Sequence, residues 1–580
     1  TSDNWGFTAT YDNAGRLYLG GIAFGFGFPA NPGAFDTTFN GAIDVVIMRF
    51  SADGTNREYA TFLGGNGPEQ PHSLIVDGEE LIIYGATGSS TFPILPNAYD
   101  TAFSGGSPVT GTGAAFNFGS DIFLTRLSGD GSSLVGSTYI NGSESDGINN
   151  LLRNNYGDNS RGEVNLDEQG NVIVASVTLS TDFPVTTPLP AGGAQDGVAF
   201  KMSADLSQMI WSTYLGGFAE DAAFSLVAQD SLVYVTGATA SQDYPSSANA
   251  HSTLYNGGAV DGFITALDAT DGSVRRSTFI GTADRDLSFF IYPDAEGNLA
   301  VLGQSTGDIP MSHAVDFGDS TSRQFLQLYS ADLSQRLRSI RIGADRSRYD
   351  FAPAAFMIDS CGITYMSGWG GGLASNGSST AGLWVSDDGL DTTTDGNDFY
   401  ILAIDANWRQ ALYGTFFGGN GTGEHVDGGT SRFSPEGIIS QAVCAGCGGT
   451  SNTPTFPANV WSTTNNSGNC NMLGFVIDFD LDTVSFGIRT FSDTVCVGDS
   501  AFFAIESVNA DSLYWDFGNG QSASGFFDGW PYASPGDYRV LVQAYNTRCD
   551  LLASDSASIH IIDPQIAVQL RADFDSCDVD

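Results

Sequence analysis

Four cysteines in the later part of the chain have a spacing suited to metal binding or to disulfide formation. Cys444 and Cys447 are separated by two residues, and Cys361 and Cys470 lie on either side of them. Four thiolates that include such a gap can hold a tetrahedral zinc ion. In an oxidising compartment the same residues form two disulfides instead. We favour the disulfides, because features described below indicate an extracellular protein.

An acidic loop offers hard oxygen ligands of the kind that calcium requires. The candidate ligands are Asp387, Asp388, Asp391, Asp395, Asn397 and Asp398. Their spacing differs from that of an EF-hand, and no closing glutamate stands at the required offset. The other interpretation, which we favour, is a solvated acidic hairpin. The sequence therefore predicts no cofactor, with calcium at this loop as the alternative.

The stretch from Glu424 to Phe433 contains His425 close to Asp427, a pair that could move protons near neutral pH. No serine or cysteine nucleophile in a strained turn accompanies the pair. Arg432 is expected to form an ion pair with Asp427 or Glu424. We therefore predict that this stretch fixes a loop and has no catalytic role.

A phrase that recurs along the chain indicates how these residues are positioned. Two of its clearest copies are Leu81-Ile-Ile-Tyr-Gly-Ala-Thr87 before Phe92-Pro93, and Val233-Tyr-Val-Thr-Gly-Ala-Thr239 before Tyr244-Pro245. A β-rich unit repeated at this period is typical of an array of small sheets.

Each repeat is predicted to form four short strands. In the fourth copy these are Asp261–Leu267, Arg276–Ile280, Leu287–Tyr292 and Leu299–Leu302. Turn signals such as Asp271-Gly272 separate them, and four antiparallel strands make one propeller blade.

The two ends of the repeat region are predicted to share a blade. The chain opens on a third and a fourth strand, Phe7–Tyr11 and Leu17–Leu19. The missing first and second strands follow the last repeat, at Gly474–Phe479 and Val484–Ile488. Their pairing in one sheet would close a seven-bladed β-propeller over residues 1–491 and remove its exposed edges.

Two sets of residues carry a family resemblance. Thr213-Tyr-Leu-Gly-Gly217, Val233–Thr239 and Asp243-Tyr-Pro245 resemble the repeat of bacterial seven-bladed propeller proteins, which are often exported. Glu424–Phe433, Cys444–Gly449 and Asn469–Asn471 resemble a narrower group. That group is the very long Bacteroidetes cell-surface proteins that end in a gliding-motility-associated C-terminal domain and leave by type IX secretion. The resemblance implies an extracellular location at the outer cell surface.

Residues 492–563 are predicted to form a second kind of β unit. Tyr514–Gly520 is a strand that enters a turn, and Pro535–Tyr545 alternates apolar and polar residues. Together they resemble a polycystic-kidney-disease-type domain, a small immunoglobulin-like β-sandwich. Cys496 and Cys549 fall on its first and penultimate strands, so we predict a disulfide between them.

The last residues, 564–580, resemble the first strand of a further sandwich. We therefore expect that the polypeptide continues beyond Asp580 and that Cys577 pairs in the next domain. The predicted fold class is all-β, with a propeller followed by immunoglobulin-like domains.

The charge of the chain excludes several partners. The 580 residues include 66 acidic and 22 basic side chains, and the net charge is -44. Such a surface repels nucleic acid and anionic membranes. No apolar run is long enough to span a bilayer, so membrane insertion is not expected either.

The acids of the repeats do not indicate catalysis. Propeller glycosidases use paired carboxylates in a central channel. Here many acids precede glycine at turns, as in Asp53-Gly54, Asp130-Gly131 and Asp271-Gly272, and the turns explain them. The sequence thus predicts that the chain is not an enzyme.

The predicted function is non-enzymatic, in adhesion or in assembly of a cell-surface appendage for gliding, attachment or cell–cell contact. The propeller would be the binding head, and the sandwich domains the stalk. Expected partners are other copies or domains of a large surface protein, glycans and other cells. Trp369, Trp384 and Trp461 could stack on sugar rings, or they could pack between blades. The alternatives are a purely structural module that contacts its own copies, and a carbohydrate-active propeller enzyme.

Overall fold

The computed structural model describes residues 3–187, 192–344, 348–372, 378–456, 458–479, 485–508, 510, 512–525, 529–546 and 551–563. The chain divides into two compact units, residues 1–478 and 479–580. Nearly all regular structure is β, and the described residues contain one short 3-10 helix, η1 (Tyr156–Ser160). No helix in these ranges is both long and apolar enough to cross a bilayer.

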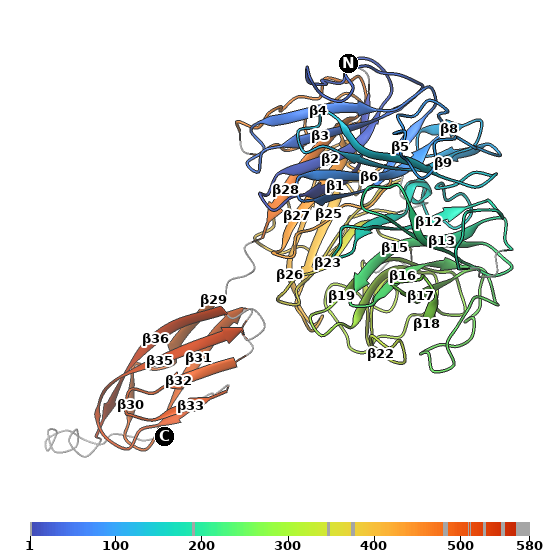
Figure 1. Ribbon diagram of the computed structural model, residues 1–580. Helices are drawn as coiled ribbons and strands as arrows, with labels where there is room; N and C mark the ends of the chain where they lie inside the picture. Colours follow the sequence, from blue (N-terminus) through green and yellow to red (C-terminus); the bar gives the residue numbers. More distant parts are fainter. Residues whose placement is uncertain are drawn as a thin grey trace, which may run out of the picture. The chain divides into compact units, whose positions relative to one another are not determined.

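The first unit is built mainly from six four-stranded antiparallel sheets, in which each strand pairs with the one before it (Figure 1). The first three sheets are β1 (Asn4–Tyr11), β2 (Leu17–Ala23), β3 (Asp44–Phe50) and β4 (Arg57–Leu63); β5 (Glu69–Asp77), β6 (Glu80–Thr87), β9 (Asp121–Leu127) and β10 (Leu134–Ile140); and β11 (Glu163–Leu166), β12 (Val172–Thr178), β13 (Asp196–Met202) and β14 (Met209–Leu215).

The next three sheets are β15 (Asp221–Gln229), β16 (Leu232–Thr239), β17 (Asp261–Asp268) and β18 (Val274–Ile280); β19 (Asp286–Pro293), β20 (Leu299–Ser305), β21 (Gln324–Tyr329) and β22 (Arg336–Ile342); and β23 (Ala352–Ile358), β24 (Thr364–Trp369), β25 (Phe399–Ile404) and β26 (Ala411–Phe417). Two-stranded sheets are formed by β27 (Ile438–Ala445) with β28 (Asn471–Asp478), and by β7 (Val109–Gly111) with β8 (Ala114–Phe116).

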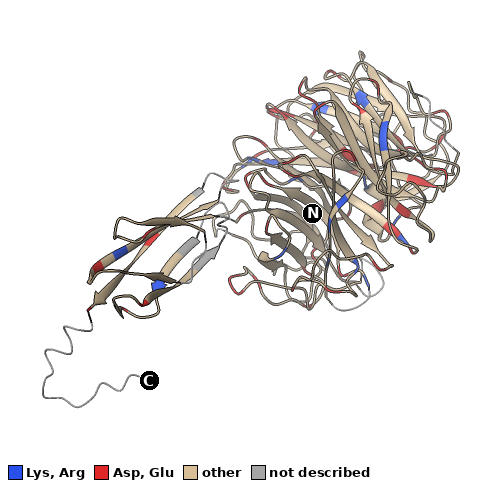
Figure 2. Cartoon of the chain, turned by 90° about the horizontal axis from the view of Figure 1, so that it is seen from below, with Lys and Arg blue, Asp and Glu red and all other residues tan. Residues whose placement is uncertain are grey.

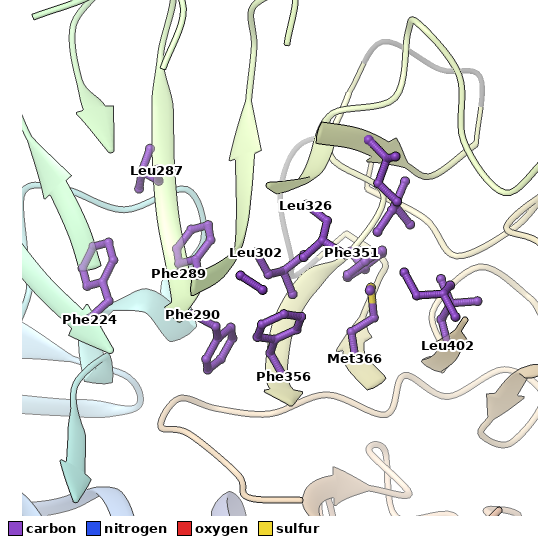
Figure 3. Packing of buried hydrophobic residues seen from close by; sticks show 14 of the residues in the cluster. Phe224, Leu287, Phe289, Phe290, Leu302, Leu326, Phe351, Phe356, Met366 and Leu402 are labelled. Carbon is purple, nitrogen blue, oxygen red and sulfur yellow. The ribbon is translucent and has the colours of Figure 1, made fainter. Parts of the chain in front are cut away.

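Apolar cores lie between neighbouring sheets. Figure 3 shows one of them, in which Phe224, Phe289 and Phe356 come from three successive sheets. The last sheet packs on the first, because Ala442 and Met472 belong to the same core as Leu19 and its neighbours. The sheets therefore follow one another around a centre, and the unit has an all-β, propeller-like fold.

The recurring phrase forms the second strand of each four-stranded sheet, and the glycine that most copies contain has a steric reason. A Cβ at Gly237 would lie 1.9 Å from the carbonyl oxygen of Ala222, and one at Gly85 would lie 2.1 Å from that of Gln70. At each place the first strand of the sheet contains a bulge, which brings its backbone close to the second strand. Only glycine leaves room for this approach.

The predicted grouping of strands was wrong by half a repeat. The four strands assigned to one blade are divided between two sheets, since β17 and β18 pair with β15 and β16, whereas β19 and β20 begin the next sheet. Both groupings contain the hairpins β17–β18 and β19–β20. They differ only in which longer link, β16 to β17 or β18 to β19, stays within one sheet. Local turn signals therefore could not decide where one sheet ends.

The predicted closure fails for the same reason. The strands β1 to β4 form a complete sheet from the N-terminal segment alone, and β28 pairs with β27. The strand expected at 484–488 is β29 (Ser485–Thr490), which pairs with β31 (Ser500–Val508) in the second unit. The boundary between the units thus lies at residue 478, where 491 was expected.

The second unit contains a three-stranded and a five-stranded sheet. Besides β29 and β31, its strands are β30 (Thr494–Cys496), β32 (Ser512–Asp516), β33 (Ser522–Ser524), β34 (Gly529–Pro531), β35 (Gly536–Asn546) and β36 (Leu551–Ile562). Trp515, Phe517 and Val540 belong to its common core. The expected further strand at 564–580 lies outside the described residues.

Candidate active site

A cavity of about 450 Å³ lies at the centre of the first unit. It is lined by the first strands of all six four-stranded sheets, namely β1, β5, β11, β15, β19 and β23, together with residues 430–433. The stretch 427–432 is held among these strands by backbone hydrogen bonds, such as Thr430 N–H to His72 O (2.9 Å) and Arg432 N–H to Ala9 O (3.0 Å). Segments distant in sequence therefore meet at one site.

Glu163, which is buried, and Arg432, which is partly buried, form an ion pair in the cavity wall. The Glu163 Oε1 atom lies 3.4 Å from Arg432 Nη1. The other oxygen of Glu163 accepts hydrogen bonds from the Ser225 hydroxyl (2.5 Å) and the Leu226 N–H (3.2 Å). Arg432 Nε donates to Leu74 O at 2.8 Å, and Nη2 donates to Val164 O. Both side chains are therefore held in one orientation.

Burial raises the pKa of Glu163 above its ordinary value, and the positive charge of Arg432 opposes that rise. A carboxyl group that keeps its proton to higher pH can act as a general acid. The pair thus gives the cavity an acid–base group whose pKa is raised, with a positive charge beside it.

Two tyrosines add hydroxyl groups to the same cavity. Burial raises the pKa of Tyr11 to about 12, with a further rise caused by Tyr292 and an opposing effect of Arg432. Burial also raises the pKa of Tyr292, again against Arg432. Both hydroxyls therefore remain protonated near neutral pH and can donate hydrogen bonds to a ligand.

The sequence analysis missed Glu163, although a comparison of the repeats could have found it. Glu163 follows η1 and begins β11, opposite Ala175. In the other sheets the matching place on the first strand is occupied by Thr8, Ser73, Ser225, Phe290 and Ala355. Glu163 is the one ionisable side chain among these six positions. Since the other sheets form without a charge there, its presence is not explained by packing.

The stretch 424–433 is arranged differently from the prediction. Arg432 pairs with Glu163 rather than with Asp427 or Glu424. Asp427 Oδ1 accepts a hydrogen bond from the Tyr156 hydroxyl (2.9 Å) and lies 3.4 Å from His425 Nε2. Burial raises the pKa of Glu424 to about 7.

The cysteines form one of the two disulfides expected in this region. Cys447 is bonded to Cys470, and Cys444 carries a buried free thiol. Cys361, in the turn between β23 and β24, is also disulfide-bonded, so three of the four cysteines are oxidised and the four-thiolate zinc site is not formed. In the second unit, the predicted pairing of Cys496 with Cys549 lies outside the described residues, because Cys549 is among those not described.

The acidic loop uses much of its oxygen for its own turns. Asp391 Oδ1 accepts from the Thr393 N–H and hydroxyl, both at 2.9 Å, and Asp395 Oδ1 accepts from the Asn397 N–H at 2.9 Å. Asp395 Oδ2 accepts from the Gly421 N–H at 2.7 Å. In Figure 2 acidic positions are spread over loops and strand ends of the chain. Calcium at residues 387–398 stays a prediction.

The three tryptophans proposed as sugar-binding residues differ in exposure. Trp369 is buried, with its ring centre 5.6 Å from those of Tyr156 and His425. Trp384 is half-buried and packs against the core of Figure 3. Trp461 is 43% exposed, beside Phe50 and under the Arg57 guanidinium. Among these three, Trp461 alone is exposed.

No family model matches the sequence, and no curated protein matches it. Solved structures of similar fold include a protein of unknown function from Bacteroides caccae, 10% identical over 64% of this chain and 89% of that one, with a TM-score of 0.31. An ulvan lyase from a new family of polysaccharide lyases is 9% identical over 81% of this chain and 94% of that one, with a TM-score of 0.38. An acylaminoacyl peptidase of Pyrococcus horikoshii is 8% identical over 85% and 60%, with a TM-score of 0.35.

The predicted non-enzymatic adhesion role is not supported by these similarities. The similar structures with a stated activity are enzymes, among them a lyase and a peptidase. The expectation that a chain of this fold is not an enzyme is therefore withdrawn. At such identities the likeness concerns the fold alone, and the reactions remain those of the other proteins.

Proposed function

We propose that the first unit is a carbohydrate-active enzyme whose reaction takes place in the central cavity. The observation that carries the proposal is the ion pair of Glu163 and Arg432, which faces a cavity of about 450 Å³ in the middle of the sheets. A buried carboxyl with a raised pKa and a fixed positive charge beside it is suited to acid–base cleavage of a polar substrate. Glu163 would exchange a proton with the substrate, and Arg432 would stabilise negative charge.

The lining of the cavity supports a saccharide as the substrate class. Tyr11, Tyr292 and Asn165 offer hydrogen-bonding groups, while Phe290 and Met357 provide apolar surface. A pyranose ring has polar edges and apolar faces, so a wall of this mixed kind fits it.

Cleavage of polysaccharides tests the proposal. The full chain is incubated with neutral and uronate-containing polysaccharides, and new chain ends are measured. We expect cleavage of at least one polysaccharide, and a fall in kcat/KM of about 10²-fold or more in Glu163→Gln. Glu168→Gln is the matched control, because Glu168 is an exposed glutamate in the turn after β11. If the wild-type chain cleaves none of the substrates, or Glu163→Gln is as active as the wild type, the proposal is wrong.

The finer architecture is also part of the proposal. We infer seven blades, of which the last combines the stretch 425–433 with β27 and β28. Isolated bridges from His425 to Cys444 and from Phe433 to Ile439 support this grouping. The second unit is proposed to be an immunoglobulin-like domain of the polycystic-kidney-disease type, because two sheets enclose its common core.

We further propose that the protein acts outside the cell, as part of a longer surface protein of the type IX secretion group. The resemblance of its repeats, its acidic composition and the Cys447–Cys470 disulfide support this location. Glycans and other domains of the same polypeptide are the proposed partners. Cell fractionation, with the chain found in the cytoplasm only, would overturn this part.

A further inference from the structure

A cluster of three sulfurs and one imidazole lies at the end of β27. His425, Cys444 and Cys447 place ligand atoms within 4.8 Å of one another. Backbone hydrogen bonds join His425 and Cys444 in both directions, at 3.2 and 2.7 Å. Cys470, which directly precedes β28, is bonded to Cys447. None of these residues lines the central cavity.

The sulfur positions suit a shared metal ion. The Sγ atoms of Cys444 and Cys447 are 3.8 Å apart. Two thiolates bound to one zinc ion at about 2.3 Å in tetrahedral geometry are separated by about 3.8 Å. Two cysteines with a two-residue gap are also a usual source of such a ligand pair.

The imidazole is oriented toward the same space. His425 Nδ1 lies 3.2 Å from the carbonyl oxygen of Gly423, which can only accept a hydrogen bond. Nδ1 therefore carries a hydrogen, and in the neutral ring Nε2 is the atom that can bind a metal.

The carboxylate beside His425 is consistent with a cation at this position. Nε2 faces Asp427 Oδ1 at 3.4 Å, and Asp427 is only 1% exposed. The other oxygen, Oδ2, has no hydrogen-bond partner among the described residues. A carboxylate next to a zinc-bound histidine is a common arrangement, and a cation here would satisfy both groups.

We propose that Cys444, Cys447, Cys470 and His425 bind one zinc ion when the Cys447–Cys470 disulfide is reduced. A dithiol reductant would supply two electrons and two protons to the disulfide, which becomes two thiols while the reductant becomes a disulfide. Zinc then binds three thiolates and one neutral imidazole, and three thiol protons pass to the solvent. The disulfide and the zinc ion are thus alternative states of one cluster, independent of the cavity chemistry.

Metal binding by the full chain tests this proposal. Protein treated with a dithiol or with an oxidant is mixed with zinc or cobalt, passed through a desalting column, and analysed for metal content and thiolate-to-cobalt absorption. We expect about one zinc per reduced chain and far less in the oxidised chain. Cys444→Ser and His425→Ala should each weaken binding by about tenfold or more. Cys496→Ser is the matched control, since Cys496 is a cysteine of the second unit without a disulfide to any described residue.

A second measurement needs no variant. Zinc should protect Cys444, Cys447 and Cys470 of the reduced chain from alkylation, while Cys496 remains reactive. No metal bound to the reduced chain, or equal alkylation of all four cysteines with and without zinc, would overturn the proposal. A protonated His425 beside Asp427 would then account for the geometry.

Discussion

Asp196 and Asp221 form a buried pair of carboxyl groups whose ionisation is expected to destabilise the fold. They are 4% and 0% exposed, at the starts of β13 and β15. Both carboxyl groups lie beside Gly216. A Cβ added at Gly216 would be 2.2 Å from Asp196 Oδ1 and 3.0 Å from Asp221 Oδ2. Burial, followed by the charge of Asp221, raises the pKa of Asp196 from 3.8 to about 7. The perturbation that we propose is Asp196→Asn.

The sign of the effect follows from the raised pKa. Between pH 3.8 and 7 the folded chain keeps the Asp196 proton that the unfolded chain has lost. The stability contributed by the protonated group is therefore fully present below about pH 3.8, and it is lost as the pH rises toward 7. A rise of about three in the pKa of Asp196 corresponds to a change in the free energy of unfolding on the order of 4 kcal/mol. Asparagine cannot ionise, so it keeps this stability at high pH.

The assay is denaturant unfolding of the first unit at pH 4 and pH 8, followed by tryptophan fluorescence. At pH 8, Asp196→Asn should be more stable than the wild type by on the order of 4 kcal/mol. At pH 4 the two should differ by less than about 1 kcal/mol. Asp316→Asn, which changes an exposed aspartate, is the control. If the wild type and Asp196→Asn lose stability in parallel between the two pH values, the reasoning is refuted.

Three further predictions follow from packing and from the acidic loop. Phe289→Ala should lower the free energy of unfolding by about 3–5 kcal/mol, measured by denaturant unfolding, because the ring is fully buried in the core of Figure 3. Gly237→Ala should destabilise the chain, since its Cβ would meet the Ala222 carbonyl oxygen at 1.9 Å. Gly372→Ala should be tolerated, because no atom of the described residues lies within 4 Å of the added Cβ, and thermal unfolding of the two variants compares them. If the loop at 387–398 binds calcium, a chelator should lower the unfolding temperature of the wild type and calcium should restore it, and an unchanged temperature would leave the solvated hairpin as the correct interpretation.

Much of the fold could be predicted from local patterns. The recurring phrase with its glycine, as in Val233–Thr239, correctly predicted a strand, because short apolar runs are a local property. That strand was expected to be the fourth of its sheet and is the second. The short hairpins, including the one at Asp271-Gly272, were also recognised from turn residues. The grouping of hairpins into sheets was not, because both groupings satisfy the same turn chemistry.

The candidate site could be predicted only in part. Arg432 was identified as a residue that needs a charged partner, but the sequence suggested Asp427 or Glu424 because they are near in the chain. Glu163 is its partner in the structure. The spacing of the cysteines and the expected oxidising environment predicted disulfides among four cysteines. Which of them pair could not be predicted, because the Cys447–Cys470 bond depends on the pairing of β27 with β28.

The sequence by itself determined the β-strand content, the repeating unit and the acidic character, because these depend on residue type and short-range periodicity. Only the tertiary structure decided which strands share a sheet, how the ends of the repeat region meet, and that Glu163, Tyr292 and Arg432 face one cavity. These features depend on contacts between segments that are hundreds of residues apart, and no local pattern encodes such contacts.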